Sequence, residues 1–161
     1  MERLLRYLAL ALCPVAFGCD GRPADEVTVV VIPKGLTHEH WQSVRRGAER
    51  CASDLAAEGI PVRIIFDGPL REKDAMAQIR IVDRRVATGV PGRTGIVLAP
   101  QHSVTMTACV ERAAEAGVPV VVIDSGLADE RHFVKYVATN NYDGGKFAAR
   151  HLYDELVKRG I

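Results

Sequence analysis

The sequence has few aromatic residues and almost no net charge. Only 6% of its 161 residues are Phe, Trp or Tyr, and 21 Lys and Arg residues are balanced by 20 Asp and Glu residues. A formal net charge of +1 leaves no basic surface to neutralise a phosphate backbone, so we expect no nucleic-acid partner. With 25% charged and 48% apolar residues, the composition is typical of a globular domain rather than a disordered tail or a coiled coil.

The sequence also lacks a long hydrophobic run near its N-terminus. The apolar stretch Tyr7–Phe17 is too short to span a bilayer as a helix, but it follows Arg3 and Arg6, a pattern typical of a secretory signal. We therefore expect residues 1–18 to form a signal peptide that is removed.

The signal run ends in Val-Ala-Phe-Gly-Cys19, which resembles the lipobox of bacterial lipoproteins, with Ala16 where Leu is commonest. On this resemblance Cys19 becomes the acylated first residue, a lipid anchor to the membrane, and residues 19–26 form a linker. The alternative is an ordinary signal peptide in which Cys19 has no special role.

Cysteine is scarce as well, with four residues in the chain. Cys13 lies in the expected signal peptide, so only Cys51 and Cys109 remain as a possible disulfide pair in an oxidising compartment. We expect these two cysteines on opposite faces of a sheet, beyond disulfide distance, and interpret both as small core residues.

Phosphate-binding loops are absent. The loop after the first predicted strand reads Pro33-Lys-Gly-Leu-Thr37, which is not the Gly-x-Gly-x-x-Gly fingerprint of a dinucleotide site, and no Walker A loop occurs anywhere. The end of that strand also lacks the clustered acidic residues of a phosphoacceptor receiver domain.

The sequence contains continuous apolar runs that alternate with segments in which apolar residues recur every three or four positions. Continuous β-branched runs are typical of strands covered on both faces. Apolar residues that recur every three or four positions between the runs predict helices, over 41–55, 76–86 and 106–113. Gly59, Gly89 and Gly117 follow these helices where a C-cap glycine is expected. The predicted strands are Val27–Ile32, Val62–Phe66, Gly95–Leu98, Val118–Ile123 and Val134–Ala138.

This order, which we interpret as βαβαβαβαβ, predicts an α/β fold with a doubly wound, five-stranded parallel sheet. In such sheets ligands bind outside the carboxyl ends of the strands, where the strand order reverses. If the first strand lies between the second and third, residues 33–40, 100–103 and 124–126 line that crevice. The chain then continues into a helix within 141–161, with Phe147, Leu152 and Leu156 on one stripe, and no strand follows it.

Two catalytic or metal-binding interpretations are weak. His38 and His40 are spaced like metal ligands, and His102 or Asp124 offers a third donor, but isolated His-x-His pairs have little specificity. Ser103, His102 and Asp124 supply the residue types of a hydrolase triad, yet nothing places Ser103 on a strained elbow. We therefore expect no metal site and no catalysis.

Trp41 and Asp124 make a stronger combination. Taken alone, Trp41 is typical of helix-to-sheet packing and Asp124, directly after the fourth strand run, of a turn cap. Together across one small crevice, an aromatic face covers the C–H groups of a sugar while a carboxylate accepts hydrogen bonds from its hydroxyls.

Three stretches resemble type 1 periplasmic binding proteins, in the ribose-binding-like branch. They are the strand run 27–32 with the helix ending in Arg46-Gly-Ala-Glu49, the stretch Gly117-Val-Pro-Val-Val-Val-Ile-Asp-Ser-Gly126, and Tyr136-Val-Ala-Thr-Asn-Asn-Tyr-Asp-Gly-Gly145. The resemblance runs from about Val27 to the end. In that family two α/β lobes joined by hinge strands close on a sugar, which is then delivered to an ABC permease or a chemoreceptor.

The resemblance implies roles for individual residues. His38, His40 and Trp41 fall where the family presents a polar residue and two aromatic residues to the sugar. Asp124 matches the hydroxyl-binding aspartate, and Ser125 stands where ribose binders have arginine. Thr139 and Asn140 resemble the first hinge crossing, in which aspartate is commoner than Asn140.

The resemblance assigns residues 27–139 to the N-terminal lobe and residues 140–161 to the hinge and the first helix of a second lobe. Since the chain has about half the family's length, we expect a truncated, exported, lipid-anchored sugar-binding protein of an ABC transporter. We expect it to need no cofactor and to bind its monosaccharide weakly. A sugar-sensing receptor ectodomain and an exported enzyme using a metal at His38, His40 and His102 remain alternatives. A sugar-responsive repressor would need a helix-turn-helix segment in place of the export signal.

Overall fold

A computed structural model describes residues 25–161 of the chain. The predicted signal peptide and Cys19 lie outside the described residues. Within them, no helix has both the length and the hydropathy needed to cross a membrane. The elements in chain order are β1 (Val27–Ile32), α1 (Glu39–Ala57), β2 (Val62–Phe66), α2 (Ala75–Thr88), β3 (Thr94–Leu98), α3 (Thr107–Glu115), β4 (Val120–Ile123), β5 (Lys135–Val137) and α4 (Asn141–Lys158).

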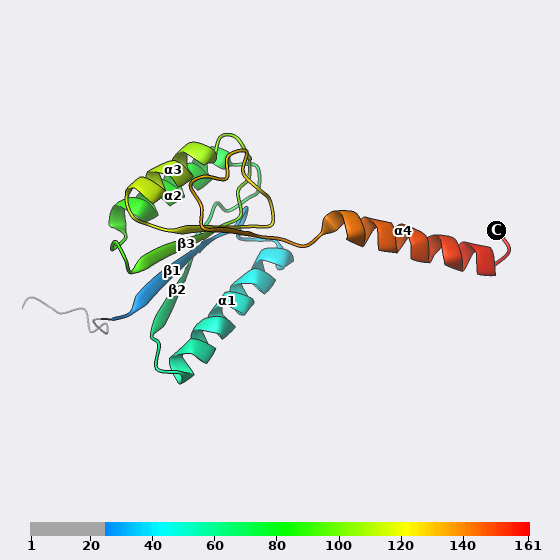
Figure 1. Cartoon of the computed structure of the whole chain (residues 1–161), viewed down its shortest axis with the longest axis horizontal. Coiled ribbons are helices and arrows are strands. Elements are labelled where there is room, and N and C mark those ends of the chain that lie inside the picture. The colour runs from blue at the N-terminus through cyan, green and yellow to red at the C-terminus, as the bar shows by residue number, and fades with distance from the viewer. Residues whose placement is uncertain (1–24) are drawn as a thin grey trace, which may run out of the picture.

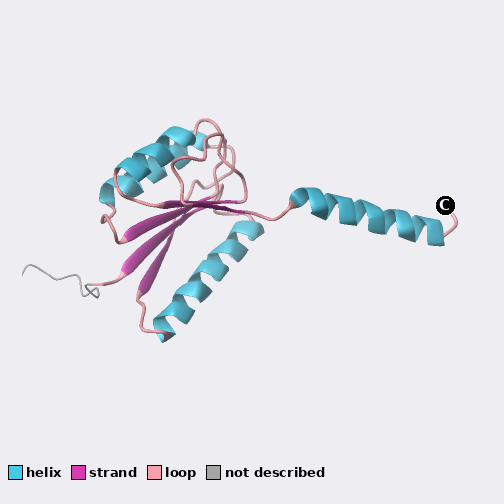
Figure 2. Cartoon of the chain, viewed as in Figure 1, coloured by secondary structure: helices cyan, strands magenta, loops and turns pink. Residues whose placement is uncertain are grey.

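The strands form one parallel sheet in the order β2-β1-β3-β4-β5. In the centre of the sheet Val29 is in register with Ile64 of β2 on one side and with Gly95 of β3 on the other. The first strand thus lies between the second and third, as the doubly wound prediction requires. Helix α1 lies on one face, and α2 and α3 lie together on the other (Figure 1 and Figure 2).

The connection between β4 and β5 differs from the prediction. The sequence order implied a helix there, whereas residues 124–134 form a loop. A crossover between parallel strands normally takes a dozen or more residues when it contains a helix, and this segment is shorter and contains Gly126. Leu127 is buried and anchors the loop in the core.

The hydrophobic core lies almost entirely on the face covered by α2 and α3. Alternate residues of β1, β3 and β4 pack against apolar residues of these two helices, and the side chains of both layers are almost completely buried. The core residues include Val30, Ile32, Ile96, Leu98, Val120 and Val122 from the sheet, and Ile81, Val82, Cys109, Val110 and Ala113 from the helices. In β3 and β4 every second residue points to the α1 face, and these residues are only half-buried. This side of the sheet is therefore less fully covered.

The two cysteines have different environments. Cys109 is buried in the core as predicted, and both its burial and the nearby Asp83 carboxylate raise the pKa of its thiol, to about 11. Cys51 is exposed, so the prediction that it is a core residue is wrong. The reason is that its side of α1 borders an open groove rather than a packed layer.

All three predicted glycines lie at the ends of their helices, and two of them adopt the left-handed conformation. Gly59 and Gly117 have φ angles of 82° and 72°, the left-handed region that glycine adopts without a steric penalty. Gly89 ends α2 with an extended backbone (φ −73°), so there it is not a left-handed cap.

Helix α4 extends away from the sheet and its flanking helices (Figure 1) and contains no buried residue. The predicted stripe of Phe147, Leu152 and Leu156 is wrong in one member. In an α-helix Phe147 projects about 140° around the axis from Leu152, so the two side chains do not share a face.

We expect Leu98→Ala to lower the free energy of unfolding by about 2–5 kcal/mol, because it leaves a cavity in the core between β3 and the helices. Leu70→Ala is the matched control, since Leu70 is 65% exposed, and we expect a change within about 0.5 kcal/mol. Urea unfolding followed by circular dichroism measures both. Equal losses in the two variants would contradict the one-sided core.

Candidate functional site

A cavity of about 340 Å³ opens at the carboxyl ends of the strands. It is bounded by the start of α1 and by the ends of β4 and β5, at the edge where the doubly wound arrangement predicts a ligand. Its volume lies at the lower end of the roughly 300–1,000 Å³ typical of small-molecule sites. The lining residues are His40, Trp41, Val44, Ile123, Asp124, Val137, Ala138 and Thr139.

Asp124 is held in place by its neighbours on β5. Its backbone N–H donates to Val137 O (3.2 Å), and the Tyr136 hydroxyl donates to the Asp124 carbonyl oxygen (3.1 Å). Its φ angle is 64°, a left-handed conformation that aspartate adopts more readily than most residues. The turn at the end of β4 thus directs this carboxylate to the cavity that Trp41 also lines.

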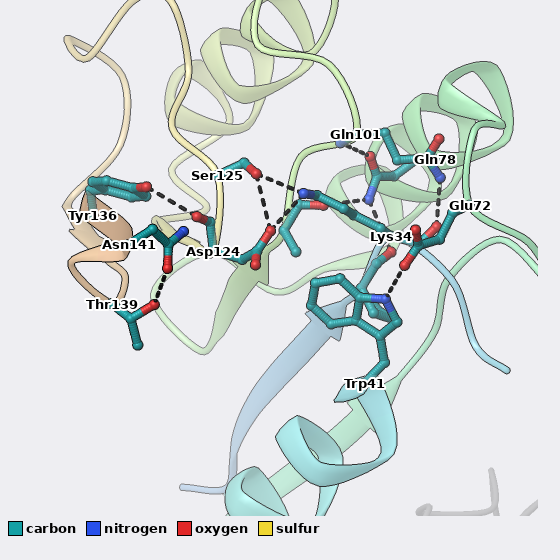
Figure 3. Close-up of polar contacts among 12 residues, drawn as sticks. Lys34, Trp41, Glu72, Gln78, Gln101, Asp124, Ser125, Tyr136, Thr139 and Asn141 are labelled. Carbon is teal, nitrogen blue, oxygen red and sulfur yellow. Dashed lines mark hydrogen bonds and ion pairs between the residues drawn. The ribbon is translucent and has the colours of Figure 1, made fainter. Parts of the chain in front are cut away.

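Lys34 makes the main polar contact with this carboxylate. Its Nζ lies 2.6 Å from Asp124 Oδ2 and donates at 2.6 Å to Ser125 Oγ, across about 90 positions of sequence (Figure 3). Partial burial opposes ionisation of Asp124, but the hydrogen bonds from Lys34 and Ser125 and the charge of Lys34 outweigh it. The pKa of Asp124 therefore lies below its usual value. The pair supplies one acceptor and one donor at adjacent points.

Trp41 lines the cavity but offers little surface to a ligand. Only 2% of the residue is exposed, its indole N–H donates to Glu72 Oε1 (2.7 Å), and the His40 ring stands edge-on to it at 4.6 Å between centroids. The structure brings Trp41 and Asp124 to one cavity, yet it corrects the expectation of an open indole face. His40, which is exposed, is the more accessible of the two rings that line the cavity.

His38, His102 and Ser125 have local partners. His38 Nδ1 accepts a hydrogen bond from the His40 backbone N–H (3.1 Å) and caps α1 rather than lining the cavity. His102 Nδ1 accepts from the backbone N–H groups of Val104 and Thr105 (both 3.3 Å). Among residues 25–161, no group of three or more His, Cys, Asp or Glu side chains is placed to hold a metal ion. Ser125 lies behind Asp124 and donates to Asp124 Oδ2 (3.0 Å).

Two glutamines brace the wall of the crevice. Gln78 is fully buried, and its amide donates to the carbonyl oxygens of Pro33 (3.0 Å) and Ala99 (2.8 Å) while accepting from the Gln101 backbone N–H (2.9 Å). Gln101 in turn donates to the carbonyl oxygen of Lys34 (2.6 Å). The loops after β1 and β3 are therefore tied together, and the backbone of Lys34 is fixed.

Thr139 and Asn140 join β5 to α4. Thr139 lines the cavity, and its hydroxyl donates to Asn141 Oδ1 (2.8 Å). Asn140 caps α4, since its side-chain oxygen accepts from the Asp143 backbone N–H (3.1 Å). The predicted hinge residues thus lie at the boundary between the sheet and the protruding helix.

The sequence analysis placed Lys34 and Gln101 in the loops along the crevice but assigned them no role, and it did not point to Glu72 or Gln78. Lys34 was detectable in principle, because it stands in the loop directly after the first strand run and every residue of that loop lies at the ligand-binding edge. The partners of Glu72 and Gln78 lie more than 20 positions away in sequence, so no local pattern reveals them.

An α/β lobe with a small, mainly apolar crevice and one carboxylate at the carboxyl ends of its strands is typical of a class of small-molecule-binding domains. The chain belongs to the periplasmic binding protein family, in its type 1, ribose-binding-like branch. The family described as "Periplasmic binding protein domain" matches residues 29–160.

Two curated proteins are similar to the chain. The D-ribose/D-allose-binding protein of Pseudomonas aeruginosa is 25% identical over 96% of this chain and 49% of its own length. The ribose import binding protein RbsB of Bacillus subtilis is 30% identical over 83% of this chain and 40% of its own. The chain therefore spans about half the length of the curated relatives it matches.

Solved structures agree with this assignment. A carbohydrate transporter solute-binding protein from Agrobacterium radiobacter, in complex with D-arabinose, is 33% identical with a TM-score of 0.68, over 83% of this chain and 42% of that one. The periplasmic component of a sugar transport system from Hahella chejuensis is 29% identical with a TM-score of 0.68, over 80% of this chain and 44% of that one. The structure matches one lobe of these proteins.

We expect Lys34→Met to raise the pKa of Asp124. The variant loses the hydrogen bond and the positive charge that lower this pKa, whereas partial burial, which raises it, remains. Since the pKa of Asp124 is depressed in the native protein, the ion pair contributes fully to folding stability at pH values above the usual carboxyl pKa. That contribution is lost as the pH falls through the depressed pKa. NMR titration of the Asp124 carboxyl carbon measures the shift. Lys158→Met, on α4, is the control, and an unchanged pKa in Lys34→Met would contradict the assigned partner.

We expect Gln78→Met to lower the free energy of unfolding by at least about 1–3 kcal/mol, the cost of one buried polar group left unpaired. The substitution leaves the Pro33 and Ala99 carbonyls and the Gln101 N–H without this partner. Arg80→Met, at an exposed position of the same helix, should change stability by less than about 0.5 kcal/mol. Urea unfolding compares the two, and equal stabilities would refute the bracing role.

Proposed function

We propose that the chain is the N-terminal lobe, with the hinge and first helix of a second lobe, of a sugar-binding protein that serves an ABC transporter. Its ligand is a monosaccharide held in the crevice at the carboxyl ends of β1, β4 and β5. The observation that carries the proposal is the Asp124 carboxylate, fixed by β5 and Lys34 at the mouth of a cavity of about 340 Å³.

The chemistry of the crevice suits a neutral polyol. A sugar hydroxyl is both a donor and an acceptor, so it can donate to Asp124, which the ion pair with Lys34 keeps charged. The ion pair leaves no net charge at that point, which favours neutral sugars over charged ones. His40, Val44 and Ile123 provide less polar surface for the C–H groups of the ring.

The residues proposed to contact the sugar are His40, Trp41 and Asp124, with Thr139 at the mouth of the cavity. His38 and Ser125 are proposed to support these residues through hydrogen bonds. His38 accepts from the His40 backbone N–H at the start of α1, and Ser125 donates to the Asp124 carboxylate. Thr139 and Asn140 are proposed as the hinge, because the chain leaves the lobe there for α4.

A single lobe can satisfy only part of a sugar's hydrogen-bonding groups. Affinity in a two-lobed binding protein comes from closure, which expels water and pairs each hydroxyl on both sides. We therefore propose weak binding by this chain, which covers about half of its relatives' length. We further propose export, anchoring through Cys19, delivery of the sugar to a permease or chemoreceptor, and no cofactor and no catalysis.

NMR titration with D-ribose, D-allose and D-arabinose tests the proposal. We expect saturable shifts confined to the Trp41 indole N–H and to His40 and Asp124, with a dissociation constant of about 1 mM or weaker, equivalent to about −4 kcal/mol. Asp124→Asn should weaken binding at least about tenfold, because a charged acceptor is lost.

Asp129→Asn is the control, since Asp129 pairs with Arg131 in the β4–β5 loop and does not line the cavity. This variant should bind as the unmodified chain does. Shifts that are absent with all three sugars, or unchanged in Asp124→Asn, would overturn the site. Micromolar affinity would overturn the argument that a second lobe is needed.

A further inference from the structure

The loop between β2 and α2, residues 67–74, lies against the loop that follows β1. The Leu36 backbone N–H donates to Pro69 O (3.0 Å), and the Asp67 backbone N–H donates to Val31 O (3.1 Å). Residues 67–74 are not among those that line the cavity of about 340 Å³. This loop therefore contacts the residues around the proposed sugar site from outside the site.

Two glycines let the two loops approach closely. A Cβ atom on Gly68 would lie 3.0 Å from Pro33 Cδ and Cγ, and a Cβ atom on Gly35 would lie 3.0 Å from the Glu72 backbone N. These distances are shorter than ordinary van der Waals contacts, so a larger residue at either position would have to displace its neighbour. The backbone of Glu72 is thus held directly against the loop that leads into α1.

The Glu72 side chain reaches from this loop to the indole of Trp41. The indole N–H donates to Glu72 Oε1 at 2.7 Å, across 31 positions of sequence (Figure 3). In Figure 3 the five-membered ring of the indole faces Glu72, and the six-membered ring lies on the side of Asp124. Trp41 is buried, and a buried indole N–H needs a hydrogen-bond partner. A carboxylate is one of the stronger acceptors for this purpose.

The indole of Trp41 in turn supports the ring of His40. The two rings stand edge-on at 76°, with 4.6 Å between their centroids, and both residues line the cavity. His40 is exposed, so the buried indole is the fixed surface against which its ring rests. A rotation of the indole would therefore move the His40 ring and change the shape of the cavity.

We propose that Glu72 is a positioning residue of the sugar site. It holds Trp41, and through Trp41 the His40 ring, in the orientation that a sugar meets, and it does so without contacting the sugar. The inference rests on the proposed function, because it concerns the same crevice. When the carboxylate is removed, the indole N–H loses its acceptor and turns toward water, and the wall of the crevice loses its defined orientation.

Spectra of the sugar-free chain test the contact first, because Trp41 is the only tryptophan in the sequence. In Glu72→Met we expect the fluorescence maximum to shift to longer wavelength, because the indole meets water. The indole N–H proton resonance should shift upfield, because its hydrogen bond is lost. Glu72→Gln retains an acceptor oxygen and should keep the native spectra. Arg71→Met, at an exposed position of the same loop, is the control and should leave both spectra unchanged.

Titration with D-ribose, D-allose and D-arabinose then tests the effect on the site. Glu72→Met should weaken binding at least about threefold, the loss expected of one hydrogen bond, whereas Glu72→Gln and Arg71→Met should bind as the unmodified chain does. In a Trp41→Phe background, which has no indole N–H, Glu72→Met should weaken binding no further, because Glu72 acts through Trp41. A merely structural role for Glu72 predicts an equal loss in both backgrounds.

Glu72→Asp keeps the charge on a side chain one methylene shorter, and it takes the place of Glu72→Met if that variant lacks a native circular dichroism spectrum. The expected changes are the same. Unchanged indole spectra in a folded variant, or equal losses of affinity in both backgrounds, would overturn the inference. A lack of sugar binding by the unmodified chain is a different result. It refutes the proposed function and with it the effect of Glu72 on binding, whereas the sugar-free spectra still decide whether Glu72 positions Trp41.

Discussion

The position of β1 between two parallel neighbours is the constraint on which the rest of this structure depends. Because β2 and β3 flank it in register, the loops after β1, β3 and β4 all emerge at one edge of the sheet. Lys34 and Asp124, about 90 positions apart, meet there as an ion pair. Without that strand order, neither the crevice nor the ion pair at its edge would exist.

The polar contacts at this edge run from the buried Gln78 side chain to the partly exposed ion pair of Lys34 and Asp124. Fully buried Gln78 fixes the backbone around Pro33 and Ala99, and Gln101 extends this support to the carbonyl of Lys34. The Lys34 side chain is then free to pair with Asp124 at the surface. Such an arrangement positions functional groups well, because each exposed group is oriented by a more rigid neighbour behind it.

The two faces of the sheet differ in how completely they are covered. One face closes into a core with α2 and α3, while the other retains an apolar groove beside α1. The exposure of Cys51 follows from this asymmetry.

The sequence alone determined the strands in chain order, all four helices of the described residues, and the edge at which Asp124 emerges. These features follow from hydrophobic periodicity and from the rule that ligands bind outside the carboxyl ends of parallel strands. It failed for the β4–β5 loop, for Cys51 and for the exposure of Trp41. Only the tertiary structure decided that Glu72 binds the Trp41 indole and that Lys34 neutralises Asp124. The physical reason is that local patterns report which face of an element is apolar, whereas side-chain partners far apart in sequence are set by how those elements pack.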